Sequence, residues 1–278
     1  MSIDSNNRAE LVIFWDAKLS NPNGDADTGL PRQNPYTQHG LVTDACIKRK
    51  IRNYLGECYD GQPGRSIYYG MGVDLVKNRE AVYTQLPKLK DKQEQLEAAK
   101  AAMLQEYIDI RLFGAVMSTN QFNSGAVRGA VQVDISESIS PVDIVELSLT
   151  RKSVDGKDGQ AQVDKNGVIT GTFGQKYVIN YGLFKTVVRY NPAQGQKNGV
   201  SQKDLDLLVE AIQNMFIGDA AASRTNLEVR KVFLIQHDST LGNGNLVESV
   251  QAKAQVEKPQ KFSDYEIVVP DNARISEV

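Results

Sequence analysis

The order of the apolar segments constrains the fold of this chain more than any other feature. Segment 9–20, AELVIFWDAKLS, is rich in aliphatic and aromatic residues. Such a nearly continuous apolar run predicts a strand, and a central one. The elements that follow are an amphipathic helix near 44–59, strands at 129–138 and 176–190, a second amphipathic helix at 201–216 and a strand at 227–238. The predicted order is therefore strand, helix, strand, strand, helix, strand.

This order is the ferredoxin-like α+β pattern that RNA-recognition folds share. Two segments interrupt it. Residues 61–109 end in KLKDKQEQLEAAKAAMLQEYIDI, a strong helix former with many charges, which predicts a helical insertion. Residues 149–178 are rich in Gly and Asp, and their Asp-Gly and Asn-Gly pairs predict a protruding β-hairpin. The main fold is then expected over 1–60, 110–148 and 179–246, with a C-terminal segment at 247–278.

Composition limits the compartment and the chemistry. With 41% hydrophobic and 24% charged residues the chain is typical of a folded domain. No apolar run approaches the roughly 18 to 20 residues of a membrane span, and the polar N-terminus lacks a signal core. Cys46 and Cys58 fall on one predicted helix about 18 Å apart, too far for a disulfide. We therefore expect a cytoplasmic protein with no membrane contact, no metal and no cofactor.

The helix near 44–59 carries the densest basic cluster of the sequence. Thr43 or Asp44 is its expected N-cap. Helical spacing predicts a buried face made of Ile47, Ile51, Tyr54, Leu55 and Cys58. The same spacing projects Lys48, Arg49 and Arg52 together from one flank, with Lys50 on the other.

The net charge of −2 argues against attraction of the whole protein to nucleic acid, so any binding must be local. A loop of about twenty residues, 21–40, dense in Asn, Gly and Pro, leads into the basic helix. A helix N-terminus offers free amides to phosphate, and Lys and Arg extend such an anionic track. This pattern predicts sequence-independent contact with a nucleic-acid backbone.

The motifs that could indicate an enzyme are weaker than this basic pattern. Asp25 and Asp27 lie in a Gly-rich loop and invite a metal-site interpretation, although Asp is also a common turn former. The segment GAVRGAV, 125–131, lacks the ending of a phosphate-binding P-loop and the spacing of a dinucleotide fingerprint. Arg128 within it is a plausible phosphate ligand. The sequence has neither a nucleophile elbow nor a Cys–His pairing, so no such motif indicates a hydrolase.

Several stretches together resemble one known family. They are NPNGDADTGLPRQNPYTQHGLVTDACIKRKIRNYL, FGAVM, RGAVQVDISESISPV, LTRKSV, YGLF, AASR and VFLIQHDSTLGN. They occur in order over most of the chain and are similar to the CRISPR-associated Cas-seven family, in its type I-C (Dvulg) subtype, the backbone subunit of Cascade.

The resemblance implies a modified RNA-recognition fold with a palm, helical fingers at 61–109 and a thumb hairpin at 149–178. Several copies would stack head to tail along the spacer of a CRISPR guide RNA and present it for pairing with target DNA. Other Cascade subunits (a Cas-five-type subunit, a large and a small subunit) would be partners. The subunit would not cut; a separate helicase-nuclease would degrade the target.

Carried onto this sequence, the resemblance implies a set of guide-RNA contacts. The set is Asn21, Asn23, Arg32, Lys48, Arg49, Lys50, Arg52, Arg128, Arg151, Lys152, Lys176 and Arg224. Related subunits of type III systems cut RNA with an aspartate in a comparable loop. A metal-dependent RNA endonuclease using Asp25 or Asp27 is therefore the alternative.

Overall fold

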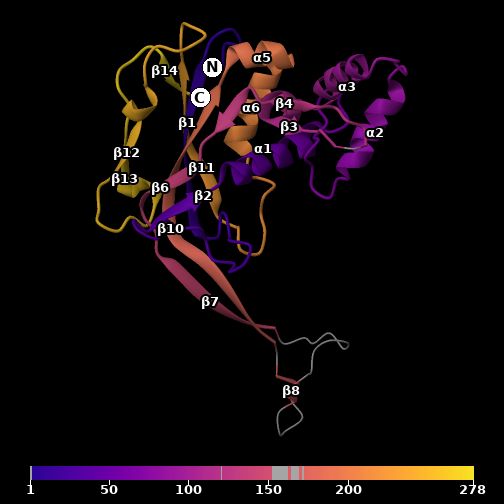
Figure 1. The fold of residues 1–278 in the computed structure, drawn as a ribbon. Helices are drawn as coiled ribbons and strands as arrows, with labels where there is room; N and C mark the ends of the chain where they lie inside the picture. The colour runs from indigo at the N-terminus through magenta and orange to yellow at the C-terminus, as the bar shows by residue number, and fades with distance from the viewer. Residues whose placement is uncertain (1, 120, 152–161, 164–168, 171) are drawn as a thin grey trace.

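The fold is built on an antiparallel sheet whose centre is the first strand. The computed structural model describes residues 2–119, 121–151, 162–163, 169–170 and 172–278. Strand β1 (Ala9–Ser20) pairs with β10 (Thr172–Tyr190) on one side and β11 (Leu227–Gln236) on the other. The order β11-β1-β10-β6, with β6 at Ser136–Pro141, confirms the predicted ferredoxin-like α+β core (Figure 1).

Two amphipathic helices cover one face of this sheet. Helix α1 (Asp44–Tyr59) and helix α6 (Gln202–Asn214) pack over Leu11, Ile13 and Trp15, which alternate along β1. Both helix starts follow from their sequences. Thr43 Oγ1 accepts a hydrogen bond from the Cys46 amide at 3.2 Å, and Ser201 with Asp204 forms a capping box before α6. A short helix, α5 (Pro192–Asn198), precedes α6.

The C-terminal segment covers the opposite face of the sheet. It contains η1 (Val247–Ser249), β12 (Gln251–Ala254), η2 (Phe262–Asp264), β13 (Tyr265–Val268) and β14 (Ile275–Glu277), which pairs with β11. Val12 and Phe14 of β1 lie under it, in a cluster with Val250 and Tyr265. Because β1 is buried on both faces, its sequence reads as a continuous apolar run rather than an alternation.

The helical insertion has a small core of its own. Helix α2 (Leu75–Gln85) and helix α3 (Lys92–Glu106) are capped by Asp74 and Asp91. They pack with α4 (Ile108–Phe113) and the strand pair β3 (Gly114–Val116) and β4 (Ala126–Arg128). The shared cluster reaches Met117 and Val127, so the packing unit extends past residue 109.

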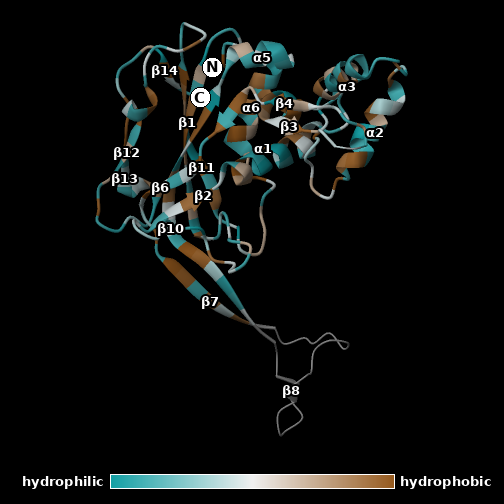
Figure 2. Cartoon of the chain, in the orientation of Figure 1, coloured by the Kyte–Doolittle hydropathy of each residue, from teal (hydrophilic) through white to brown (hydrophobic). Residues whose placement is uncertain are grey.

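A long hairpin projects from the body. Strand β7 (Ile144–Arg151) pairs with the first half of β10, from Ile144 opposite Ile179 to Arg151 opposite Thr172. The hairpin therefore starts at Ile144, earlier than the predicted residue 149. The described part of its tip is β8 (Gln162–Val163) paired with β9 (Ile169–Thr170). Figure 2 shows hydrophobic residues continuing along the part nearest the body. Leu147 and Leu149 of β7 are both more than 40% exposed.

Three local expectations were wrong. The predicted strand at 129–138 is split into β5 (Val131–Val133) and β6 by a one-residue register shift against β10, and Ile135 at the shift is exposed. The predicted loop at 21–40 ends in an edge strand, β2 (His39–Val42). Cys58 is exposed at the end of α1 instead of facing the core.

Both cysteines are free, as their shared helix predicts. Within the described ranges, no helix combines the length and apolar character needed to cross a lipid bilayer.

Candidate nucleic-acid interface

The sheet face that an RNA-recognition fold ordinarily offers to RNA is closed in this protein. In such domains aromatic residues of the sheet stack on bases. Here that face holds Phe14, Tyr181 and Phe233, which are buried beneath the C-terminal segment. Lys185 on the same face donates to the carbonyl oxygens of Val247 and Val250 at 3.2 and 2.9 Å. The expected RNA contact must therefore lie on the loops and helix ends.

The loop after β1 is ordered by its own polar side chains. Asn23 Oδ1 accepts hydrogen bonds from Thr43 N–H at 3.0 Å and from Thr43 Oγ1 at 3.1 Å, which ties the loop to the N-cap of α1. Gly24 bridges to Pro31, and Arg32 forms an ion pair with Asp25 at 3.1 Å. Asn23 is thus a structural link, with its side-chain oxygen already occupied.

A second loop, between α6 and β11, lies against the first. The backbone N–H of Asn21 donates to the Ser223 carbonyl oxygen at 2.7 Å, and the backbone N–H of Asn226 donates to Ser20 Oγ at 3.1 Å. Lys176, at the root of the hairpin, donates to the Ala222 carbonyl oxygen at 2.5 Å. Residues 21–32 and 217–226, here called the joined loops, therefore meet at the base of the hairpin (Figure 1). The loop that carries Arg224 therefore lies beside the loop after the first strand.

The four basic residues of α1 have different environments. Lys48 pairs with Asp44 one turn earlier at 2.9 Å. Arg49 is exposed and, within the described part of the chain, has no ion pair. Lys50 and Arg52 are largely buried and held by acidic partners. The single basic flank predicted from helical spacing is therefore reduced to Arg49, with Lys48 beside it.

Lys50 lies beneath the joined loops rather than on the surface. It is 2% exposed, is paired with Asp219 and lies over the Phe216 ring, 5.5 Å from its centroid. Arg224 also pairs with Asp219, at 3.4 Å. Asp219 is thus a buried hub that anchors the second loop on α1. The structure corrects the inclusion of Lys50 among exposed phosphate ligands, because its ammonium group already neutralises a buried carboxylate.

Arg52 holds the helical insertion on the core. Its Nε donates to Asp109 Oδ2 at 2.9 Å, and its guanidinium carbon lies over the rings of Tyr69 and Phe113, 5.3 and 5.1 Å from their centroids. Asp109 is fully buried and also accepts hydrogen bonds from the Tyr68 and Tyr69 amides. Arg52 is therefore corrected from a surface ligand to a structural residue.

The remaining predicted contacts are dispersed. The Arg128 side chain is exposed on β4, and no described contact joins it to the joined loops. Arg151 ends strand β7, and Lys152 lies outside the described residues. The structure brings Asn21, Asn23, Arg32, Lys176 and Arg224 together and keeps Arg49 on the neighbouring helix.

Two important acids, Asp109 and Asp219, were missed by sequence reasoning. An isolated Asp in a loop or on a short helix carries no signal of burial in a single sequence. A buried Arg or Lys needs a paired carboxylate, but nothing in the spacing shows which acid reaches it.

Asp25, one of the two acids of the alternative endonuclease site, also has a defined geometry. Asp25 Oδ1 accepts from the Asp27 and Thr28 amides at 3.1 and 3.3 Å, as in a turn-forming aspartate. These backbone hydrogen bonds, with smaller help from Arg32, hold the pKa of Asp25 below its usual value. Among the described residues, no group of three or more His, Cys, Asp or Glu side chains is arranged to hold a metal ion.

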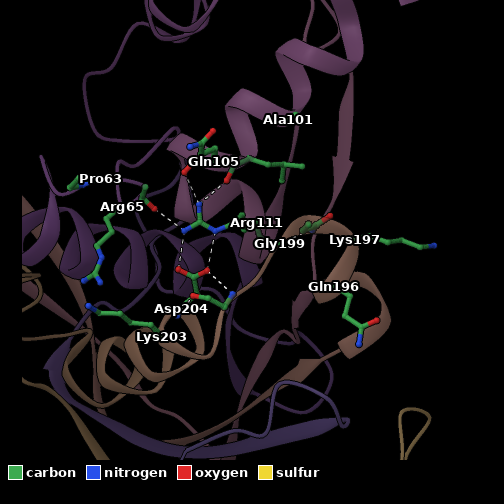
Figure 3. Close-up of a pocket in the computed structure, with 14 residues that line it drawn as sticks. Pro63, Arg65, Ala101, Gln105, Arg111, Gln196, Lys197, Gly199, Lys203 and Asp204 are labelled. Carbon is green, nitrogen blue, oxygen red and sulfur yellow. Dashed lines mark hydrogen bonds and ion pairs between the residues drawn. The ribbon is translucent and has the colours of Figure 1, made fainter. Parts of the chain in front are cut away.

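An open cleft of about 680 Å³ lies at the other end of α1, between the insertion and the turn from α5 to α6 (Figure 3). At its floor Arg111 pairs with Asp204 at 2.9 Å and donates to the carbonyl oxygens of Leu104, Gln105 and Gly64. Every donor group of Arg111 is thus engaged by the protein itself. The cleft shares no lining residue with the joined loops, and we assign its floor a structural role.

Comparison with known proteins gives consistent matches. The family model described as CRISPR-associated protein Cas7 matches residues 7–270. A CRISPR-associated protein Cas7 from Haloferax volcanii is 32% identical over 120 residues, 40% of this chain. The matched region spans 33% of the length of that relative.

Three chains from solved structures also align. A chain of a CRISPR RNA-guided surveillance complex, pre-nicking, covers 82% of this chain and 78% of its own length, at 17% identity and a TM-score of 0.49. A chain of another CRISPR RNA-guided surveillance complex covers 82% and 68%, at 14% identity and a TM-score of 0.44. A chain of the Type III-B Cmr-beta complex bound to cognate target RNA covers 83% and 61%, at 12% identity and a TM-score of 0.45. We draw nothing about function from likenesses at these TM-scores.

Proposed function

This chain belongs to the CRISPR-associated protein Cas7 family, and we propose that it is the non-catalytic, RNA-binding backbone subunit of a CRISPR RNA-guided surveillance complex of the type I-C Cascade kind. Several copies polymerise head to tail along the spacer of one guide RNA. Together they present that RNA for pairing with a target DNA strand.

The observation that carries this proposal is the meeting of three segments at the base of the hairpin. The loop after β1, the loop before β11 and the hairpin root are joined by the contacts of Asn21 with Ser223 and of Lys176 with Ala222. Cationic side chains from all three segments, Arg32, Arg224 and Lys176, gather there in a protein whose net charge is −2. A local basic track of this sort binds a nucleic-acid backbone without reading its sequence.

We assign the guide-RNA contacts accordingly. Arg32, Lys176 and Arg224 contact phosphates at the joined loops, and Arg49 extends the track along α1 with Lys48. Asn21 and Asn23 shape the loop. Arg128, Arg151 and Lys152 are further proposed contacts away from this cluster. Lys50 and Arg52 are left out, since both support the fold by neutralising buried carboxylates.

Head-to-tail polymerisation needs two different surfaces on each copy. The hairpin supplies a candidate for one of them. Leu147 and Leu149 are exposed on β7, and exposed apolar side chains on a projecting hairpin suit a protein contact. In this assignment residues 144–178 form the thumb, 61–109 the fingers, and 1–60, 110–143 and 179–246 the palm, followed by the segment 247–278.

The other partners follow from the proposed complex. They are a Cas-five-type subunit, the large and small Cascade subunits and, indirectly, the helicase-nuclease that degrades the target. We place the assembly in the cytoplasm. Co-expression with a guide RNA and these subunits tests the proposal: a ribonucleoprotein with several copies per RNA supports it, and a single copy on each RNA overturns it.

A further inference from the structure

The joined loops contain an unusual concentration of unpaired polar atoms. Among the described residues, four buried side-chain nitrogen or oxygen atoms have no hydrogen-bond partner. Three of them, Asn21 Oδ1, Arg32 Nε and Arg224 Nε, belong to the joined loops; the fourth is Arg79 Nε, in the helical insertion. Native proteins rarely leave such atoms unpaired, so their concentration at one place points to a missing partner.

Asn21 defines what that partner must offer. Its side chain is 8% exposed, and its Nδ2 donates to the Gly29 carbonyl oxygen at 3.0 Å. That contact fixes the orientation of the amide, because the flipped form would set two oxygens against each other. The atom left over is therefore an acceptor, and its partner must be a hydrogen-bond donor.

The Nε–H groups of Arg32 and Arg224 are donors, so they require a hydrogen-bond acceptor instead. Arg32 pairs with Asp25 through Nη1 and keeps its Nε–H without a partner, whereas Arg224 Nε lies 3.4 Å from Asp219 Oδ2 in an ion pair that lacks hydrogen-bond geometry. Guanidinium groups donate, and phosphate oxygens accept. A bridging phosphodiester has no hydrogen to give to Asn21. Of the two nucleic-acid backbones, only RNA offers both characters, since its ribose 2′-hydroxyl is a donor that DNA lacks.

We propose that Asn21 Oδ1 accepts a hydrogen bond from a ribose 2′-hydroxyl of the bound strand, while Arg32 and Arg224 hold adjacent phosphates, so that the joined loops select RNA over DNA. This assignment rests on the proposed RNA-binding function and adds a sugar specificity to it.

Gly24 provides the approach to Asn21. This exposed glycine lies against the amide: an added Cβ would be 3.1 Å from Asn21 Nδ2 and 3.5 Å from Oδ1. Gly24 has no side chain to cover the amide on this side, and Oδ1 is buried in the free protein, so the proposed contact requires the Gly24 backbone to move outward. A methyl group at Gly24 narrows this approach without changing any charge.

The test is a binding comparison between matched oligonucleotides. The full chain is titrated against a labelled single-stranded RNA and against the same sequence with every ribose replaced by 2′-deoxyribose. The wild type should bind the RNA about threefold to tenfold more tightly, the range expected for one net hydrogen bond. Asn21→Ala should bind both strands with equal affinity, close to that of the wild type for the deoxy strand.

Two further variants keep the test decisive. Gly24→Ala should also reduce the preference for RNA, and it decides the matter if Asn21→Ala fails to fold. Lys253→Ala, an exposed residue of the C-terminal β12–β13 hairpin, is the matched control and should keep the full preference.

The binding data separate a wrong assignment of Asn21 from a wrong proposed function. Equal affinity of the wild type for the two strands, or a full preference for RNA in folded Asn21→Ala, overturns the assignment of Asn21 but leaves RNA binding intact. If a base rather than the sugar supplied the donor to Asn21, the wild type would bind the two strands with equal affinity. If the wild type binds neither strand, the proposed function itself falls.

Discussion

Arg52 Nε donates a hydrogen bond to Asp109 Oδ2 at 2.9 Å, and this ion pair fastens the helical insertion to helix α1. The Asp109 side chain is fully buried, while that of Arg52 is 12% exposed. A basic side chain that looks like part of a phosphate-binding flank in the sequence is thus committed to the fold.

Arg52→Ala should lower the free energy of unfolding by about 3–5 kcal/mol, because it leaves the Asp109 charge buried without a cation. Urea denaturation followed by circular dichroism measures the loss. Arg49→Ala on the same helix is the matched control and should change stability by no more than about 0.5 kcal/mol. Wild-type stability in Arg52→Ala would show that Asp109 does not depend on this pair.

Arg49→Ala should instead weaken RNA binding. One phosphate contact fewer on a single strand should reduce the slope of log K against log salt concentration by about 0.7. Binding isotherms at several salt concentrations, with Lys253→Ala as a surface control, measure this slope. An unchanged slope in Arg49→Ala would remove the residue from the proposed track.

Thr43 couples the start of α1 to the loop after β1. Thr43→Ala removes the hydroxyl that both caps the helix and donates to Asn23 Oδ1. The loss should be about 1 kcal/mol of stability, with faster amide exchange in residues 21–32. Thr43→Ser keeps the hydroxyl and should behave like the wild type. Equal exchange in Thr43→Ala and Thr43→Ser would argue against this coupling.

Tyr59 makes the free energy of unfolding depend on pH in the alkaline range. Its hydroxyl donates to Glu210 Oε1 at 2.5 Å, and this hydrogen bond to a carboxylate raises the pKa of Tyr59 to about 12 from the ordinary 10.0. Because the folded state holds the phenolic proton more tightly, the contribution is complete below pH 10 and is lost as pH rises from 10 to 12.

Tyr59→Phe should therefore lose stability at neutral pH and show a shallower decline between pH 10 and 12 than the wild type. Thermal melts across this range, together with tyrosinate absorbance, check the prediction. Burial and then the hydrogen bond to the same Glu210 carboxylate also raise the pKa of Tyr54. Parallel pH profiles for Tyr59→Phe and the wild type would contradict the assignment to Tyr59.

The assembled complex should not cut RNA when Mg²⁺ or Mn²⁺ is added. Asp25 is engaged by turn amides and by Arg32, which leaves little freedom for a metal-binding role. Incubation with labelled RNA, analysed on denaturing gels, provides the measurement. Metal-dependent cleavage that disappears in Asp25→Ala or Asp27→Ala would replace the backbone role with that of an endonuclease.

Local patterns in the sequence were sufficient for the main elements. The apolar run at 9–20, the cap at Thr43 and the amphipathic character of α1 and α6 each depend on neighbours within a few residues, and the structure confirms them, apart from the exposed Cys58 at the end of α1. The order of these elements also predicted the ferredoxin-like core, since short-range chain connectivity leaves few arrangements for it.

Long-range pairing decided the rest. Helical spacing can place Lys48, Arg49 and Arg52 on one flank, but it cannot show that Asp109 and Asp219 approach from distant segments and bury Arg52 and Lys50. Nor could it show that residues 247–278 close the sheet face, which leaves the loops as the place for the proposed RNA contact. The sequence by itself determined which elements form and that their basic residues gather near a long loop. Only the tertiary structure decided which of those charges stay free. A basic side chain that pairs with a buried carboxylate from a distant segment is no longer available to bind another anion.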